Sequence, residues 1–168
     1  DGVTGTCVMR LTEGLDSGPV ALRSEAPIAA DDTYGSLAPR LADLSGSLLV
    51  EALDLWAAGA LEERFVPQDD AEATYAEKIE RDDRLVDTAL PAAEVDRRIR
   101  ALTPHIRAAA ELAGGERLGL RSAGVAAGGS AGTFAADGDA LLLGCDGGAV
   151  RLSEVQPAGG RWMAAAEY

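Results

Sequence analysis

The sequence has 168 residues, which is enough for one ordinary domain or for part of one domain and a small second one. Its 47% hydrophobic and 26% charged residues exclude a disordered chain. The net charge of −13 opposes binding to nucleic acid. The charge is unevenly distributed, since residues 1–96 carry a net charge of −14 and residues 97–168 a net charge of +1. All basic residues in this second part are arginines. The second part is therefore compatible with a phosphate-contacting face.

The first elements in the chain are predicted to be two strands with a loop between them. Residues 4–11 form an apolar-rich run that predicts a buried strand, and residues 20–28 predict a second strand. Between them, residues 13–18 (Glu-Gly-Leu-Asp-Ser-Gly) form a tight loop in which glycines flank Asp16. Such a carboxylate can accept a proton, orient a histidine or position a water, although an ordinary acidic turn has the same spacing.

The hydrophobic period then changes to that of a helix. Thr33 or Ser36 is expected to cap its start and Gly59 to end it, while Ser45-Gly46 leaves open two consecutive helices. We expect Trp56 to be a packing anchor. The apolar face is formed by Leu37, Leu41, Leu44, Leu48, Ala52 and Leu55.

A polar linker and a second helix follow. Residues 63–87 contain a dense set of acids, which is typical of a linker. The helix is predicted from Pro91, a favourable first-turn residue, to Leu102. Its apolar face carries Val95, Ile99 and Leu102, and Arg97, Arg98 and Arg100 lie around its other sides.

The rest of the chain, from residue 108 onward, has the alternation of β-strands. Leu118 and Leu120 alternate with arginines, as Val150 and Leu152 alternate with Arg151 and Ser153. Asp-Gly pairs at 137–138 and 146–147 indicate hairpin turns, and residues 123–132 indicate a flexible loop. Five short strands predict a small closed or nearly closed antiparallel barrel.

Cysteines and histidine indicate no metal site. Cys7 and Cys145 are expected to be free, partly buried thiols in a reducing cytosol, and there is no Cys-x-x-Cys spacing. His105 is expected to be a packing residue. No apolar run is long enough to cross a bilayer and no leader is recognised, and the start at Asp1 suggests a chain that begins inside a longer gene product.

Four segments in order resemble one protein family. Residues 4–18 resemble the folate-dependent formyltransferases, in which Thr-Gly-Val-Thr-Ile-Met is followed after a few residues by Gly-Leu-Asp-Thr-Gly. Three more segments resemble the branch of methionyl-tRNA formyltransferases: a linker motif (Tyr75-Ala-Glu-Lys-Ile79), the first helix of the C-terminal domain (92–102) and its closing strand and turn (152–161, then Met163).

The resemblance implies an α/β part followed by a β part. Residues 1–62 would be the C-terminal part of a Rossmann-like formyltransferase catalytic domain. Residues 63–87 would be a linker, and residues 88–168 a small OB-like antiparallel β-barrel with one helix that binds tRNA.

The resemblance also implies a reaction. The amino group of methionyl-initiator tRNA would take the formyl group from 10-formyltetrahydrofolate, without a metal. Asp16 matches the family's catalytic aspartate, and Glu13, Gly14 and Leu15 would border the pterin pocket. The family's Asn-x-His pair and Ser-Leu-Leu-Pro loop are not in this chain, so the fragment is expected to be inactive alone.

Contacts to tRNA are expected from Lys78, Arg97, Arg98 and Arg161. Lys78 and the arginines of the helix could instead be solvated or paired with nearby acids. The sequence departs from the family at residues 103–106, where Asn-Pro-Trp-Pro is usual, and at Gly160, where a lysine is usual. The family's tRNA contacts are therefore not carried over to those positions. Trp162 could stack on a base but is expected to pack. A cytoplasmic monomer without membrane contact is expected.

Two alternatives stay open. A sugar-nucleotide formyltransferase or a formyltetrahydrofolate hydrolase of the same family would keep the fold and change the substrate. A non-catalytic nucleic-acid-binding β-barrel would have no active site at all.

Overall fold

The computed structural model describes residues 2–168 and divides the chain into two compact units. The first unit contains the chain up to residue 32 together with residues 36–77. The second contains residues 33–35 and 78–168. No helix within residues 2–168 is both long and apolar enough to cross a membrane.

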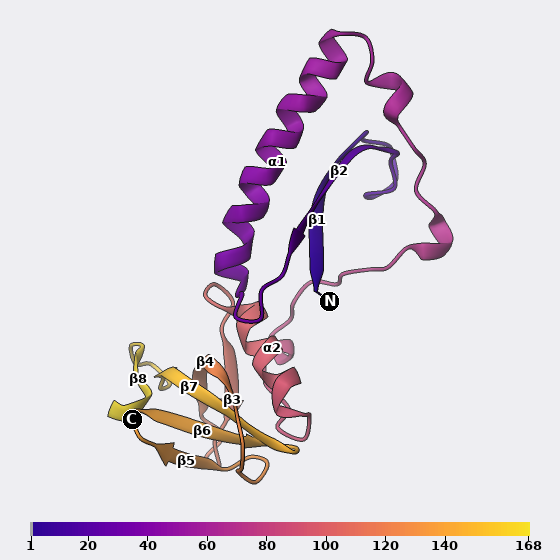
Figure 1. Cartoon of the computed structure of the whole chain (residues 1–168). Helices are drawn as coiled ribbons and strands as arrows, with labels where there is room; N and C mark the ends of the chain where they lie inside the picture. Colours follow the sequence, from indigo (N-terminus) through magenta and orange to yellow (C-terminus); the bar gives the residue numbers. More distant parts are fainter. Residues whose placement is uncertain (1) are drawn as a thin grey trace. The chain divides into compact units, whose positions relative to one another are not determined.

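A β-hairpin and all but the first two residues of one long helix form the main part of the first unit (Figure 1). Strand β1 (Val3–Met9) pairs antiparallel with β2 (Val20–Pro27), with a register shift between Val8 and Met9. Helix α1 (Tyr34–Ala57) buries Leu48 and Ala52. The Thr6 and Ser45 hydroxyls are 2.6 Å apart and link β1 to the middle of α1.

Helix α1 ends as its sequence predicts. The N–H of Ala60 donates to the carbonyl of Leu55, and the N–H of Gly59 donates to that of Trp56. These paired bonds, with Gly59 at a φ of 73°, form a Schellman motif. The helix is continuous through Ser45-Gly46, so the alternative of two helices is wrong. Trp56 is 70% exposed, so its expected role as a packing anchor within this chain is also wrong.

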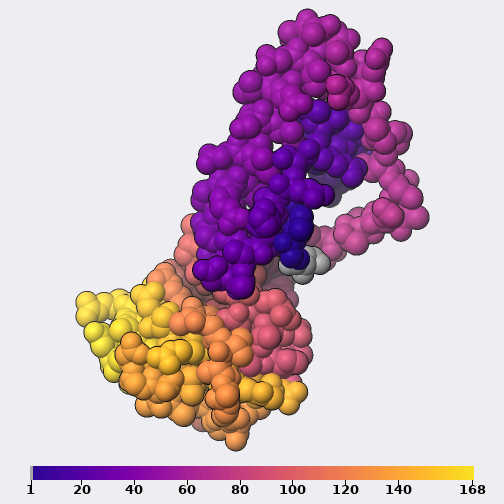
Figure 2. Space-filling view, in the orientation of Figure 1, coloured from indigo at the N-terminus to yellow at the C-terminus, as the bar shows by residue number. Residues whose placement is uncertain are grey.

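Three 3₁₀ turns interrupt the polar stretch that follows α1: η1 (Glu62–Arg64), η2 (Asp70–Glu72) and η3 (Asp82–Arg84). Between η1 and η2, Val66 forms an antiparallel bridge with Val20, which closes the chain back onto β2. Residues 71–77 are exposed throughout, and Figure 2 shows this stretch, in magenta, standing away from the body of its unit.

The second unit contains a six-stranded antiparallel sheet. Its order is β3-β4-β7-β6-β5, with β8 also pairing with β7. The strands are β3 (Ala108–Glu111), β4 (Arg117–Ala126), β5 (Phe134–Asp137), β6 (Ala140–Cys145), β7 (Gly148–Gln156) and β8 (Met163–Ala164), and a last 3₁₀ turn, η4, spans Ala165–Glu167.

This sheet differs from the expected barrel. Within residues 2–168 no pairing joins β3 to β5, so a closed barrel is not confirmed. Six strands form instead of five, because residues 163–164 add a short strand to β7. Strand β4 continues to Ala126 and pairs there with Ala149, so the first four residues of the loop predicted at 123–132 belong to a strand. Its small residues occur at a position where the ladder is irregular.

Helix α2 (Ala92–Leu102) covers the sheet and completes the core. Its predicted apolar face is confirmed, since Val95, Ile99 and Leu102 are all buried. They belong to one hydrophobic cluster with residues of β4, β6 and β7 (Leu118, Leu120, Leu143, Val150, Leu152 and Val155). Both Asp-Gly pairs occupy hairpin turns as expected, with Gly138 at φ 61° and Gly147 at φ 66°.

Candidate functional site

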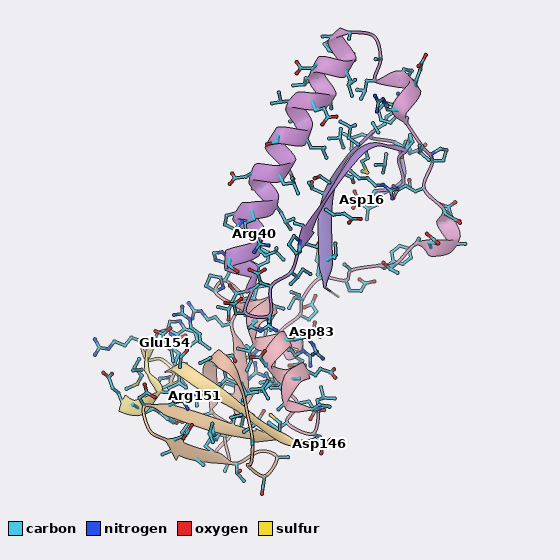
Figure 3. The ribbon with its side chains drawn as sticks, in the orientation of Figure 1. Asp16, Arg40, Asp83, Asp146, Arg151 and Glu154 are labelled. Atoms are coloured by element: carbon cyan, nitrogen blue, oxygen red, sulfur yellow. The ribbon has the colours of Figure 1, made fainter. Side chains whose placement is uncertain are left out.

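The loop between β1 and β2 carries Asp16, the predicted catalytic residue (Figure 3). Asp16 has a φ of 48°, a left-handed conformation that aspartate tolerates better than most side chains. Its side chain is exposed, and its carboxylate has no hydrogen bond or ion pair within residues 2–168. The carboxylate is therefore free to contact a reactant or a further protein segment.

Hydrogen bonds to main-chain carbonyls hold this loop in place. The side-chain amide of Gln68 donates to the carbonyls of Asp16 and Gly18, both at 2.8 Å, from a segment about 50 residues later. The N–H of Arg10 donates to the carbonyl of Pro19 at 3.0 Å and closes the base of the loop. Asp16 is thus positioned by contacts to its own main chain, while its side chain stays unoccupied.

Sterics explain why Gly18 ends the loop motif. A Cβ atom at position 18 would lie 1.7 Å from the carbonyl oxygen of Arg10, a backbone atom that cannot move aside alone. At Gly14 the nearest obstacle is the hydroxyl of Ser17 at 2.4 Å, which a side-chain rotation can remove. Gly18 is therefore required by a close approach of two chain segments, and Gly14 is not.

The residues expected to border a folate pocket are open to solvent. Glu13, Gly14 and Leu15 are all exposed, and Leu15 is 89% exposed. The cleft described below is lined by residues of the second unit and by none of these three residues. A pocket at this loop would therefore need walls from other residues.

The four residues predicted to contact tRNA are exposed and lie on different segments of the chain. Arg97 and Arg98 lie on α2, Lys78 precedes η3, and Arg161 precedes β8. Within residues 2–168 none of them has an ion pair or a side-chain hydrogen bond. The alternative in which Lys78 pairs with nearby acids is therefore not observed, and all four charges are available to a phosphate.

Four other arginines of the second unit have acidic partners within 4 Å. Arg100 pairs with Asp96 at 2.8 Å, and Arg117 with Asp82 at 3.7 Å. Arg121 pairs with Glu154 at 2.6 Å, and Arg151 pairs with Asp137 and Asp139. These ion pairs distinguish arginines that have an acidic partner from arginines that have none within residues 2–168, a division that the sequence pattern does not show.

Arg107 is a basic residue that the sequence analysis missed. It is exposed, has a φ of 73°, and uses one guanidinium nitrogen to donate to the side chain of Gln156 at 3.1 Å. No acid pairs with it within the described part of the chain. Its position between α2 and β3 carries no recognisable motif. Arg81 and Arg84 of the same unit are likewise exposed without an ion pair within residues 2–168.

An open cleft of about 480 Å³ lies in the second unit. Arg121 lines it with its guanidinium 4.3 Å above the ring of Trp162, so Trp162 packs as expected. The two arginines of the cleft are matched by acids, and it has no strong net charge. Its other lining residues are Thr33, Gly35, Arg100, Thr103, Pro104, Ser122, Ser153 and Glu154.

Two buried aspartates hold helices in place. Asp96 accepts from Arg100 and from the hydroxyl of Ser122, which ties α2 to β4. Asp32 lies just before α1 and has a pKa lowered to about 2, first by the hydrogen bond from Ser36, then by the N–H of Ala29 and by Arg40. Arg40 also donates to the carbonyl of Pro27 at 2.6 Å, so this cluster joins α1 to the end of β2.

Neither cysteine is part of a reactive cluster. Both thiols are free, as expected, but Cys7 is exposed and only Cys145 is buried, where desolvation raises its pKa. His105 is exposed and contacts the Tyr34 ring edge to face at a centroid distance of 5.7 Å. No group of three potential metal ligands occurs among residues 2–168.

Comparison with solved structures supports the fold. HypX from Aquifex aeolicus, in complex with tetrahydrofolic acid, matches with a TM-score of 0.73 at 19% identity over 99% of this chain and 30% of that one. WlaRD, a sugar 3N-formyl transferase, matches with a TM-score of 0.62 at 14% identity over 96% of this chain and 57% of that one. At these identities the likeness concerns the fold alone.

Sequence comparison gives a more specific result. The chain is 42% identical to methionyl-tRNA formyltransferase of Pseudomonas paraeruginosa over 99% of its length, and 41% identical to that of Dechloromonas aromatica over 100%. It spans only about half of these relatives, 54% and 53% respectively. Residues 1–53 match the formyl transferase family model and residues 78–168 match the model of the formyl transferase C-terminal domain. The chain therefore belongs to the formyl transferase family of enzymes.

Proposed function

We propose that residues 1–168 form part of an enzyme that transfers the formyl group of 10-formyltetrahydrofolate to the amino group of methionyl-initiator tRNA, in translation initiation. The observation that carries this proposal is the match of nearly the whole chain to proteins named methionyl-tRNA formyltransferase at about 40% identity. The free carboxylate of Asp16, on a loop fixed by Gln68, supports a role in catalysis.

The reaction requires a nucleophile, stabilisation of an oxyanion and a proton transfer. The amine of the methionyl group attacks the formyl carbon and forms the new C–N bond, with an oxyanion on the tetrahedral intermediate. The bond from that carbon to the donor nitrogen of the folate then breaks, and a proton moves from the attacking amine to the departing nitrogen. Asp16 is proposed to orient the group that moves this proton, a histidine or an ordered water.

Folate binding is proposed beside the same loop. Glu13, Gly14 and Leu15 would border the pterin ring, and their exposure leaves room for it. The residues facing them would come from outside the first unit, as the resemblance to the family implies for its Asn-x-His and Ser-Leu-Leu-Pro segments. The chain alone is therefore proposed to be inactive.

The tRNA is proposed to contact exposed basic residues that lack acidic partners. The candidates are Lys78, Arg97, Arg98 and Arg161, to which we add Arg107. Arg23, Arg64, Arg81 and Arg84 are also exposed without an ion pair within residues 2–168, but the resemblance does not name them. Such contacts to phosphate position the RNA and depend on salt. We also propose the division into residues 1–62 (catalytic), 63–87 (linker) and 88–168 (tRNA-binding), in a cytoplasmic monomer.

A sugar-nucleotide formyltransferase is the second candidate. Its support is the fold likeness to WlaRD, but the identity there is 14%, against 42% for the tRNA enzyme of Pseudomonas paraeruginosa. The sequence comparison therefore favours tRNA as the acceptor.

The test uses a hybrid protein, in which residues 1–168 replace the matching stretch of the Pseudomonas paraeruginosa relative. We expect the hybrid to formylate methionyl-initiator tRNA with 10-formyltetrahydrofolate as the donor, and residues 1–168 alone to be inactive. Formylation of an amino-sugar nucleotide but not of the tRNA, by a folded hybrid, would favour the second candidate. A folded hybrid that transfers formyl to neither acceptor would contradict the proposal.

A further inference from the structure

Strands β3, β4 and β7 turn one face towards the core of the second unit and leave the other face outside it. The core side carries buried residues of these strands: Ala108, Ala110, Leu118, Leu120 and Val155. Because side chains alternate along a strand, Gly119, Arg121 and Gln156 lie on the other side, which we call the outer face. Arg107, just before β3, reaches the outer face, because its guanidinium donates to the side chain of Gln156.

The side chain of Gln156 links two separate basic segments. Its oxygen accepts from a guanidinium nitrogen of Arg107 at 3.1 Å, and its nitrogen donates to the carbonyl of Gly160 at 2.8 Å. Gly160 is bonded directly to Arg161, and both arginines are exposed. A single amide group therefore holds the two chain segments from which these arginines extend.

The backbone of Arg107 has a conformation that arginine seldom adopts. Its φ of 73° lies in the left-handed region, which suits glycine. Among residues 2–168 the other non-glycine residue with a positive φ is Asp16, the proposed catalytic residue. Strain of this kind is found most often at functional sites, so the side chain of Arg107 is a candidate for a role beyond folding.

Two arginines at the outer face differ in the partners that hold them. Arg121 pairs with the carboxylate of Glu154 at 2.6 Å, so its charge is matched by an acid. Arg107 is held by the neutral amide of Gln156, which orients the guanidinium without opposing its charge. The remaining N–H donors of Arg107 can bind the oxygens of a phosphate in a forked geometry.

We propose that Gln156 is a positioning residue that holds Arg107 and Arg161 as one binding site for phosphate groups of an RNA backbone. The choice of tRNA as the bound molecule rests on the proposed function. Gln156 carries no charge, so a search of the sequence for basic residues does not find it. Free phosphate shares the chemistry of the RNA backbone, and the experiments below distinguish the two.

The first test measures the binding of initiator tRNA to the hybrid protein. Arg107→Gly removes the guanidinium and places glycine at a φ that suits it, so urea unfolding should show no loss of stability. Binding of tRNA should weaken about tenfold, and the salt slope should fall by about one. Arg84→Ala, which removes another exposed arginine without an ion pair within residues 2–168, is the control and should weaken binding less than about twofold. Equal effects of the two variants, or unchanged binding in Arg107→Gly, would overturn the proposal.

The second test asks whether Gln156 acts through Arg107. Gln156→Ala should raise the KM of the hybrid for tRNA several-fold and leave kcat unchanged, and Gln156→Glu should raise KM further, because its carboxylate would pair with Arg107 and repel phosphate. Combined with Arg107→Gly, Gln156→Ala should have a smaller effect than it has alone. Multiplicative effects, or a lower kcat at unchanged KM, would overturn the positioning role.

Calorimetric titration with inorganic phosphate separates the two sources of phosphate. We expect no saturable binding of inorganic phosphate that depends on Arg107. Saturable binding that is lost in Arg107→Gly while tRNA binding stays unchanged would overturn the proposal in favour of free phosphate. A hybrid that binds tRNA through Arg107 and Gln156 but does not formylate it would leave the site standing and count against the proposed function. A hybrid that formylates tRNA with the same KM in every variant would overturn the site alone.

Discussion

Replacing Gly18 by alanine should disrupt the loop that carries Asp16. The added Cβ would lie 1.7 Å from the carbonyl oxygen of Arg10, about half the normal separation of such atoms, so one chain segment must move by more than 1 Å. That movement would break the hydrogen bond from Arg10 to Pro19 and those from Gln68 to the carbonyls of Asp16 and Gly18. At about 1 kcal/mol for each bond, the loop should be destabilised by about 3 kcal/mol.

Amide hydrogen exchange measured by NMR reports the loss of loop stability at single residues. The exchange rate of the Arg10 amide should rise about a hundredfold in Gly18→Ala, which corresponds to about 3 kcal/mol. Gly14→Ala in the same loop is the control, because only the movable hydroxyl of Ser17 lies in the way, and its exchange should stay within a few-fold of the wild type. Equal exchange in the two variants would refute the steric reasoning.

Three further predictions follow from burial and charge. Ile99→Ala should destabilise the second unit by about 3 kcal/mol in urea unfolding, since Ile99 is 0% exposed, and unchanged stability would contradict its place in the core. Asp32→Asn should remove the part of the stability that the wild type loses as the pH falls from about 4 to about 2, because the folded pKa of Asp32 is lowered to about 2; identical acid denaturation of both proteins would contradict this. In the hybrid, Arg161→Ala should weaken tRNA binding a few-fold and reduce the salt slope by about one, whereas Arg151→Ala, whose side chain already pairs with Asp137 and Asp139, should have a smaller effect; the reverse order would contradict the assignment.

Local patterns predict most of the secondary structure of this chain. Period-two alternation around Leu118 and Leu152 identifies β4 and β7, and the spacing of Val95 and Ile99 identifies the buried face of α2. The stop of α1 at Gly59 also follows from sequence, because a left-handed C-cap favours glycine. In each case the signal lies within a few residues of the feature that it predicts.

Features that depend on distant residues are not readable in this way. The burial of Asp32 depends on Arg40 and on the chain end of β2, and that of Asp96 on Ser122 of another strand. The path of the sheet is decided by which strands pair, so six strands in an open order were not distinguishable from a five-stranded barrel. Trp56 is expected to be a packing anchor, whereas it is 70% exposed and its face of α1 has no partner within the described residues.

The candidate site shows the same division. The glycines and the acid of residues 13–18 identify the loop, and the structure explains Gly18 by a backbone contact. The role of Asp16 rests on the resemblance and stays a proposal. For the basic residues, the sequence supplies the candidates Arg97, Arg98 and Arg161, and only the ion pairs separate them from Arg121 and Arg151.

The most direct measurement of the central claim is the turnover of the hybrid protein carrying Asp16→Asn, on charged initiator tRNA with saturating 10-formyltetrahydrofolate. The substitution keeps the shape of the side chain and removes its charge, so kcat should fall at least about a hundredfold while the KM for tRNA changes little. Asp43→Asn, on the polar face of α1, should retain the activity of the unmodified hybrid. Wild-type turnover in Asp16→Asn would remove this carboxylate from the mechanism.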